Sequence, residues 1–389
     1  MNLDELKDLS CSIEEELKEE FEKVSDFIFN NPELGGEEYV SSKYLADKIK
    51  EYGFKVTMPY CDIDTAFRAE LGDEGETTIA FLAEYDALPG YGENNEAGHA
   101  CGHNWIAAGT LGASVVLSKL KKYFNGKVVL IGTPAEETIG YKCNLVNMGA
   151  FDDIDAVFQM HLEAYNNVNC KALAMDSLEF TFEGVAAHAA SHPHMGVNAL
   201  DAVNLTFAGI NAIRQHVKSD VRIHGIISDG GQVPNIVPDK AACKFYIRAL
   251  DRNYLNEITS KVINCAKGAE LMTGAKLSYR NFENSFDNIV NHPKLQKIMK
   301  KNLERVGVID FIEGGDGPTG STDIGNVSQV CPTMYTELKL DINPMSYVHE
   351  KEFLHHVNSK EAYDKLHKSI KAMVGASLEL YLDKELLKK

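Results

Sequence analysis

The sequence predicts an α/β protein in which a helix-covered, largely parallel sheet carries an inserted, ferredoxin-like α+β domain. Three observations lead to this fold class. Short apolar runs of strand length alternate with amphipathic helical segments from the N-terminus to about residue 161. Between residues 173 and 291 the order changes to strand, helix, strand, strand, helix, strand. A helical pattern and one more strand then follow His292, and we expect them to rejoin the first sheet.

The first part of the chain is expected to begin with two helices. Apolar residues recur every three or four positions from Leu9 to Val24, and Tyr39 to Tyr52 forms a second helical pattern that Gly53 ends. A third helix is expected at Ile106–Leu120. Strands are expected at the apolar runs 54–58, 78–82, 127–131 and 155–161.

The middle of the chain is expected to form a domain of its own. Strands are predicted at 179–184, 222–228, 240–248 and 276–280, and helices at 198–215 and 253–271. This order is that of the split βαβ sandwich. We therefore expect residues 1–172 and 292–389 to form one domain, into which residues 173–291 are inserted as a second domain.

Composition narrows the classes of function. The formal charge of −18 disfavours nucleic acid and anionic membranes as partners, because both are bound largely through lysine and arginine. The N-terminus is acidic where a secretory signal would be basic, and no run reaches the roughly 18 apolar residues of a membrane span. Eight cysteines in 389 residues are no dense disulfide framework. We expect a soluble protein of the reducing cytoplasm.

Residues with metal-ligand chemistry follow the strand at 78–82. The segment 83–89 carries Glu84 and Asp86, and the segment 98–104 carries Cys101 and His103. Active sites of α/β sheets gather at the carboxyl ends of their strands, and thiolate and imidazole are metal ligands. Considered alone, Cys101 would more often be a small buried hydrophobe and His103 a hydrogen-bonded polar residue.

The next two strands repeat this arrangement. The strand at 127–131 leads into Glu136 and Glu137, and the strand at 155–161 ends in His161. A glutamate pair is usually solvated, but a metal hydrolase needs one carboxylate to bind the ion and another to accept a proton from water. His349 stands in a late loop and completes the candidate set, although alone it would be an ordinary loop histidine.

These segments resemble the aminoacylase and carboxypeptidase family of dinuclear metalloamidases. Within that family they resemble the branch of hippurate hydrolase, indoleacetyl-amino-acid hydrolases and aminobenzoyl-glutamate hydrolase. The resemblance spans nearly the whole chain. Its motifs are Asn31-Pro32-Glu33-Leu34, Glu84-Tyr85-Asp86-Ala87-Leu88-Pro89, Ala100-Cys101-Gly102-His103, Pro134-Ala135-Glu136-Glu137, Ala187-His188-Ala189-Ala190, 230–239 and 320–326.

The resemblance implies two divalent metal ions, zinc first, with manganese, cobalt or nickel as alternatives. It makes Glu136 the general base and implies that Asp86 and Asp323 support the site. It assigns the metal-ligand positions to Cys101, His103, Glu137, His161 and His349. Relatives outside the branch have a histidine ligand at the position of Glu84, so Glu84 is not assigned as a ligand. Asn104 stands where the branch frequently has an aspartate.

Three residues of the inserted domain receive roles. The resemblance implies that residues 173–291 form a homodimer in which His188 reaches the partner's site and steadies the oxyanion, and that Asn235 contacts substrate. Arg248 is a candidate for pairing with a substrate carboxylate, because a guanidinium suits one. The alternatives are a surface histidine for His188 and a surface arginine at a strand end for Arg248.

The sequence thus predicts a metal-dependent amidohydrolase that cuts a small N-acyl amino acid or a dipeptide with metal-activated water. A dedicated dipeptidase and an aminobenzoyl-glutamate-type hydrolase are variants of this prediction. Two other classes stay open. A catalytically dead binding protein would lack a metal ligand or the general base, and the sequence has all of these residues. A cysteine amidase would use Cys101 as a nucleophile and would need no set of metal ligands.

Overall fold

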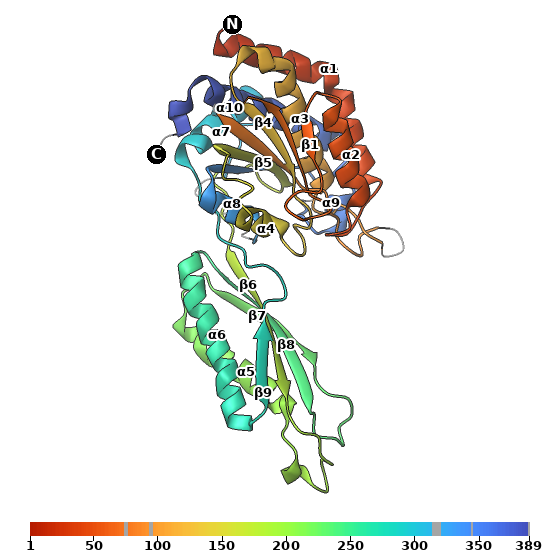
Figure 1. The fold of residues 1–389 in the computed structure, drawn as a ribbon, viewed down its shortest axis with the longest axis vertical. Helices are drawn as coiled ribbons and strands as arrows, with labels where there is room; N and C mark the ends of the chain where they lie inside the picture. The colour runs from red at the N-terminus through yellow and green to blue at the C-terminus, as the bar shows by residue number, and fades with distance from the viewer. Residues whose placement is uncertain (74–76, 93–95, 313–319, 344, 388–389) are drawn as a thin grey trace. The chain divides into compact units, whose positions relative to one another are not determined.

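Two separate sheets organise the protein, as the computed structural model shows (Figure 1). The structure describes residues 1–389 except 74–76, 93–95, 313–319, 344 and 388–389. The first unit comprises Met1–Lys171, Ile289–Pro318 and Asn326–Lys389, and the second comprises Ala172–Asn288 and Thr319–Gly325. The described helices include none with the length and hydropathy that a membrane crossing requires.

The sheet of the first unit has the strand order β1-β2-β4-β3-β5-β10. Strands β4, β3, β5 and β10 are parallel, while β1 and β2 are antiparallel additions at one edge. The strands are β1 (Lys55–Thr57), β2 (Phe67–Gly72), β3 (Thr78–Ala83), β4 (Lys127–Gly132), β5 (Ala156–Glu163) and β10 (Thr333–Lys339). The predicted helix-covered, largely parallel sheet is confirmed, although the sequence patterns did not predict β2.

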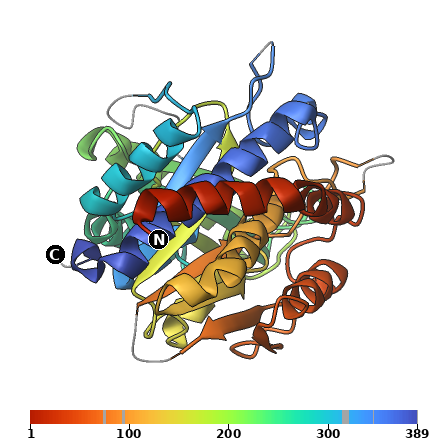
Figure 2. The same cartoon turned by 90° about the horizontal axis from the view of Figure 1, so that it is seen from above.

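An inner helix packs on this sheet, and further helices pack on the inner one. The apolar helix α3 packs directly on β3, β4 and β5, and α1 and α10 pack on α3. Figure 2 shows α1 lying along the outside of this layer. The helices are α1 (Leu3–Phe29), α2 (Tyr39–Lys50), α3 (His103–Leu120), α4 (Tyr141–Asn147), α7 (Pro293–Arg305), α8 (Ile324–Val330), α9 (Lys351–Leu354) and α10 (Lys360–Leu382).

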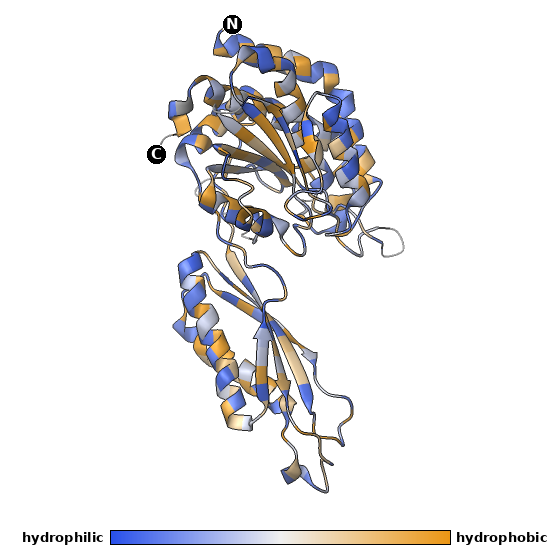
Figure 3. Ribbon diagram, viewed as in Figure 1, coloured by the Kyte–Doolittle hydropathy of each residue, from blue (hydrophilic) through white to orange (hydrophobic). Residues whose placement is uncertain are grey.

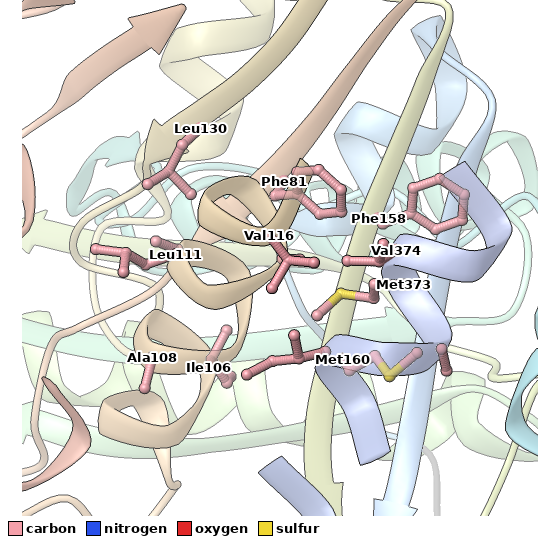
Figure 4. Packing of buried hydrophobic residues seen from close by; sticks show 14 of the residues in the cluster. Phe81, Ile106, Ala108, Leu111, Val116, Leu130, Phe158, Met160, Met373 and Val374 are labelled. Atoms are coloured by element: carbon pink, nitrogen blue, oxygen red, sulfur yellow. The ribbon is translucent and has the colours of Figure 1, made fainter. Parts of the chain in front are cut away.

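Helix α3 is apolar on nearly all sides because protein surrounds it, which is typical of a buried helix. Side chains of β3 and β5 such as Phe81 and Met160 meet α3 and α10 in a common core (Figure 4). At Gly112 a Cβ atom would lie 2.6 Å from Cδ1 of Ile370, so glycine permits the close approach of α10. Figure 3 shows the hydrophobic central strands beneath these helices. This packing fixes the first turn of α3, where His103 lies.

The second unit contains a four-stranded antiparallel sheet in the order β7-β8-β6-β9, with α5 and α6 packed against it. The chain order strand, helix, strand, strand, helix, strand confirms the predicted ferredoxin-like topology. Its core is separate from that of the first unit. The elements are β6 (Ala174–Glu183), α5 (Ala199–Ile213), β7 (Arg222–Asp229), β8 (Lys240–Ala249), α6 (Arg252–Thr273) and β9 (Lys276–Arg280).

Candidate metal centre

Three adjacent parallel strands deliver acidic and imidazole side chains to one edge of the first sheet. Glu84 and Asp86 follow β3, Glu136 and Glu137 follow β4, and His161 lies near the end of β5. Because parallel strands end at the same edge, these segments converge although they are far apart in sequence.

Cys101 and His103 come from the turn that begins α3. Gly102 caps this helix at φ 76°, a left-handed conformation that glycine adopts without strain from a Cβ atom. Sγ of Cys101 lies 3.4 Å from Nε2 of His161, and the rings of His103 and His161 meet edge to face. The ligand atoms of these three buried residues all lie within 4.8 Å of one another.

The two buried histidines both direct Nε2 toward this cluster. Nδ1 of His103 donates to Oδ1 of Asp86 at 2.8 Å, and Nδ1 of His161 donates to the carbonyl of Leu162. Each arrangement leaves Nε2 available as a ligand atom. Nε2 of His103 is buried and has no hydrogen-bond partner within the described chain. A buried polar atom in that state is costly, and a metal ion would satisfy it.

Burial and the neighbouring charges shift the pKa values of the three residues in different directions. Burial opposes a charge on His103, but Asp86 and Glu84 outweigh it and hold its pKa well above the usual range. Burial and the charge of His103 lower the pKa of His161 to about 4. Burial and Glu137 raise the pKa of Cys101 well above that of a free thiol.

Asp86 connects two candidate ligands. Its Oδ1 accepts from His103, and its Oδ2 accepts from the backbone N–H of Glu137 at 2.9 Å. Oε1 of Glu137 lies 3.0 Å from Nε2 of His349 and 3.9 Å from Nε2 of His103. The ligand atoms of Cys101, Glu137 and His349 form a second compact group.

The side chain of His349 is 47% exposed, and backbone hydrogen bonds hold its segment. Its N–H donates to the carbonyl of Ala100 at 2.9 Å, and the hydroxyl of Tyr91 donates to its carbonyl. Its φ of 67° is unusual for a residue with a side chain and marks a loop whose conformation the surroundings determine.

The loop that carries Glu136 is held by a glutamate that the sequence patterns did not single out. Ala135 adopts φ 57°, and its N–H donates to Oε1 of the buried Glu38 at 2.7 Å. Burial and the charge of Asp86 raise the pKa of Glu38 to about 7. A carboxylate oxygen of Glu136 and the ligand atoms of His103 and Glu137 lie within 4.8 Å of one another and form a third compact group.

The sequence patterns also did not predict a buried ion pair beside the cluster. Nζ of Lys142, in α4, lies 2.6 Å from Oε1 of Glu84, and both side chains are almost fully buried. Oε2 of Glu84 lies 3.6 Å from Nε2 of His103. Burial opposes the charge of Glu84, but Lys142 and the two histidines outweigh it and lower its pKa to about 2. No sequence pattern predicts this, since a lysine among polar residues is normally exposed.

The remaining predicted residues lie in the second unit. His188 is exposed, its Nδ1 accepts from the N–H of Ser191 at 3.2 Å, and its segment forms a β-bridge with the segment of Asn235. Arg248 is half-buried on β8, and its Nε has no hydrogen-bond partner within the described chain. Asp323 is fully buried and directly precedes α8.

Comparison with known proteins agrees with this geometry and defines the class: the protein is a metal-dependent amidohydrolase of the peptidase type. The model of "Peptidase family M20/M25/M40" matches residues 80–379. The chain belongs to this family, which confirms the resemblance inferred from its motifs.

Two curated relatives illustrate the similarity. The chain is 33% identical over 405 aligned residues to the Xaa-Arg dipeptidase of Homo sapiens, covering 99% of this chain and 91% of the relative. It is 34% identical over 309 residues to one of the subunits of the p-aminobenzoyl-glutamate hydrolase of Escherichia coli, covering 76% of this chain and 64% of that one.

Solved structures share the fold. The aminobenzoyl-glutamate utilization protein of Klebsiella pneumoniae superposes with a TM-score of 0.74 at 19% identity, covering 98% of this chain and 100% of that chain. The YxeP protein of Bacillus subtilis, described as a dinuclear metal-binding peptidase of the M20 family, superposes with a TM-score of 0.69 at 17% identity, covering 94% and 99%.

Proposed function

We propose that this amidohydrolase cleaves dipeptides or small N-acyl amino acids in the cytoplasm, with zinc as its metal. The observation that carries the mechanism is the unpartnered Nε2 of His103, buried among thiol, imidazole and carboxylate ligand atoms. A set that includes a cysteine favours a thiophilic ion, although manganese, cobalt or nickel would also fit. The proposed ligands of two ions are Cys101, His103, Glu137, His161 and His349.

When bound, such ions would polarise the scissile carbonyl and lower the pKa of a water molecule. The residues of this chain would supply the remaining chemistry. Glu136 adjoins His103 and Glu137, and we assign it as the base that takes a proton from the attacking water and passes it to the leaving nitrogen. Asp86 holds His103 and Glu137 in place, and Asp323 is proposed to support the site from the segment before α8.

The proposed substrate carries a carboxylate. Arg248 is half-buried with an unsatisfied Nε, and its guanidinium lies 5.7 Å from the ring centroid of Tyr246. A planar guanidinium forms paired hydrogen bonds with a carboxylate, so Arg248 is proposed to bind that of the substrate, with Asn235 as a second contact. The name of the human relative favours a dipeptide, and that of the Escherichia coli relative favours an aminobenzoyl-glutamate type of substrate.

We also propose that residues 173–291 form a domain that mediates a homodimer, with His188 acting on the partner's site. The exposure of His188 and its neighbouring asparagine supports this assignment. Mixing the inactive variants His188→Ala and Glu136→Gln under subunit exchange should restore activity, because one site of each mixed dimer would have both residues intact. A mixture that stays inactive despite proven exchange, or a fully active monomer, would overturn the assignment.

Removal of metal tests the proposed chemistry. Treatment with a chelator should abolish hydrolysis of dipeptides, N-acetyl amino acids, hippurate and aminobenzoyl-glutamate, and re-addition of zinc, manganese, cobalt or nickel should restore it. The ion that restores the highest rate identifies the metal, and the substrate with the highest kcat/KM identifies the acyl group. Activity that survives complete metal removal would favour the cysteine amidase, and no activity with any metal or substrate would favour the binding protein.

A further inference from the structure

The residues on either side of Glu136 are held by two different carboxylates. The N–H of Glu137 donates to Oδ2 of Asp86 at 2.9 Å, and the N–H of Ala135 donates to Oε1 of Glu38 at 2.7 Å. Ala135 and Glu38 are both fully buried. The proposed base therefore lies between two anchored backbone N–H groups.

Glu38 stands at the start of helix α2. It directly precedes Tyr39, the first residue of that helix, and its carbonyl accepts from the N–H of Ser42 at 3.0 Å. Helix α2 packs against β2 and α3 of the first unit. The carboxyl group that holds Ala135 is thus carried by a packed helix, which fixes its position better than a loop would.

The segment 33–38 in front of α2 lies against the two loops that carry the site. The carbonyl of Glu33 accepts from the N–H of Ala87 at 2.8 Å, which connects the segment to the loop after β3. At Gly35 a Cβ atom would lie 2.4 Å from Oγ1 of Thr138, so glycine permits a close approach to the loop after β4. The contact made by Glu38 is therefore part of a packed junction between these segments.

Ala135 adopts a backbone conformation that is unfavourable for alanine. Its φ of 57° lies in the left-handed region, where Cβ crowds the following carbonyl. Its carbonyl accepts from the N–H of Gly140 at 2.8 Å, and its N–H has Glu38 as a partner. Without an acceptor at Glu38 the buried N–H would lose this bond, and the backbone would turn toward an ordinary conformation. Such a turn would redirect Glu136, which follows directly.

We propose that Glu38 is a positioning residue that orients the carboxylate of Glu136 for proton transfer. This inference rests on the proposed function, since it takes Glu136 as the base. The two anchoring carboxylates differ in what they hold. Asp86 also accepts from Nδ1 of His103, a proposed metal ligand, whereas the hydrogen bond of Glu38 reaches the backbone just before the base. Loss of the Glu38 carboxyl should therefore reduce the rate and spare the metal.

The role requires a hydrogen-bond acceptor and no charge. Burial and the charge of Asp86 raise the pKa of Glu38 to about 7, and a neutral carboxyl keeps an oxygen that accepts. Glutamine offers such an oxygen on a side chain of the same shape. Methionine has a similar length, but its thioether is a weak acceptor. Glu38→Gln and Glu38→Met therefore form a matched pair that differs in the acceptor.

Kinetics and metal content of this pair test the inference. The substrates are dipeptides, N-acetyl amino acids, hippurate and aminobenzoyl-glutamate, and the enzyme is loaded with zinc. Glu38→Gln should keep kcat within about threefold of wild type. Glu38→Met should lower kcat about 10- to 100-fold, the order of loss that a small misplacement of a catalytic group causes, with KM and zinc content at the wild-type level.

Two further variants complete the experiment. Asp155→Ala is the control, because Asp155 accepts from the N–H of Thr78 at 2.7 Å at the opposite end of β3, and it should leave kcat, KM and zinc content unchanged. If Glu38→Met does not fold, Glu38→Asp replaces it, since a side chain shorter by one methylene withdraws the acceptor from Ala135. Glu38→Asp should then show the same selective loss of kcat.

Three outcomes would overturn the role of Glu38. The first is a kcat of the acceptor-deficient variant within about threefold of wild type. The second is an equal loss in Glu38→Gln, which would show that the acceptor is not what matters. The third is a loss of zinc in parallel with kcat, which would make Glu38 a support of the metal instead of the base. No hydrolysis of any of these substrates by zinc-loaded wild type would refute the proposed function itself.

Discussion

Replacement of Asp86 by asparagine should weaken metal binding without unfolding the protein. Asp86 accepts two hydrogen bonds, one from Nδ1 of His103 at 2.8 Å and one from the N–H of Glu137 at 2.9 Å. Asparagine has one oxygen and one NH₂ group, so one of the two donors would face another donor. The change therefore disturbs the orientation of one candidate ligand whichever way the amide is turned.

The size of the effect follows from the lost interaction. A hydrogen bond to a charged group contributes about 1.5–3 kcal/mol, and each 1.4 kcal/mol is a factor of ten in an equilibrium constant. The dissociation constant for zinc should therefore rise by about 10- to 100-fold, the range typical of groups that orient metal ligands. The apolar core of the first unit is unaffected, so the far-ultraviolet circular dichroism spectrum should not change.

Competition for zinc with a chromogenic chelator measures this dissociation constant. Asp153→Asn is a matched control, because Asp153 pairs with Arg68 in the same unit and contacts no candidate ligand. The control should bind zinc as tightly as wild type does. If Asp86→Asn binds zinc within twofold of wild type, the hydrogen bonds of Asp86 do not orient the ligands and the reasoning is refuted.

Three further changes have defined outcomes. Cys101→Ala should lower both metal occupancy and rate, whereas full occupancy with no activity would support a cysteine nucleophile. Lys142→Met should destabilise the metal-free protein by about 3–5 kcal/mol in urea unfolding because it leaves Glu84 buried without its partner, and a loss below about 1 kcal/mol would contradict this. Gly112→Val should destabilise it by about 1–3 kcal/mol through a clash with Ile370, which an unchanged melting temperature would disprove.

Local patterns predicted much of the fold. Continuous apolar runs identified β3, β4 and β5, because a strand covered on both faces needs apolar residues throughout. Strand β2 alternates apolar Phe67, Ala69 and Leu71 with charged Arg68 and Glu70, so a search for continuous apolar runs overlooked it. The prediction also started α3 at Ile106, whereas the helix begins at His103, directly after the left-handed Gly102.

The candidate metal centre was predictable for a similar reason. Its residues stand where strands end, a position that the sequence shows directly, and parallel strands bring such positions together. Lys142 was not predictable in this way. It is buried only because Glu84 lies opposite it. Such pairings depend on tertiary contacts between segments far apart in sequence.

Glu136 is proposed to move the proton in a reaction at a metal centre. Measuring zinc content and kcat of Glu136→Gln on the same preparation tests it most directly, since the amide cannot accept a proton but leaves the five proposed ligands unchanged. We predict wild-type zinc content with kcat reduced about 10²- to 10⁴-fold, the usual contribution of a general base. A variant that keeps more than about a tenth of the wild-type rate, or that loses its zinc, would contradict the account.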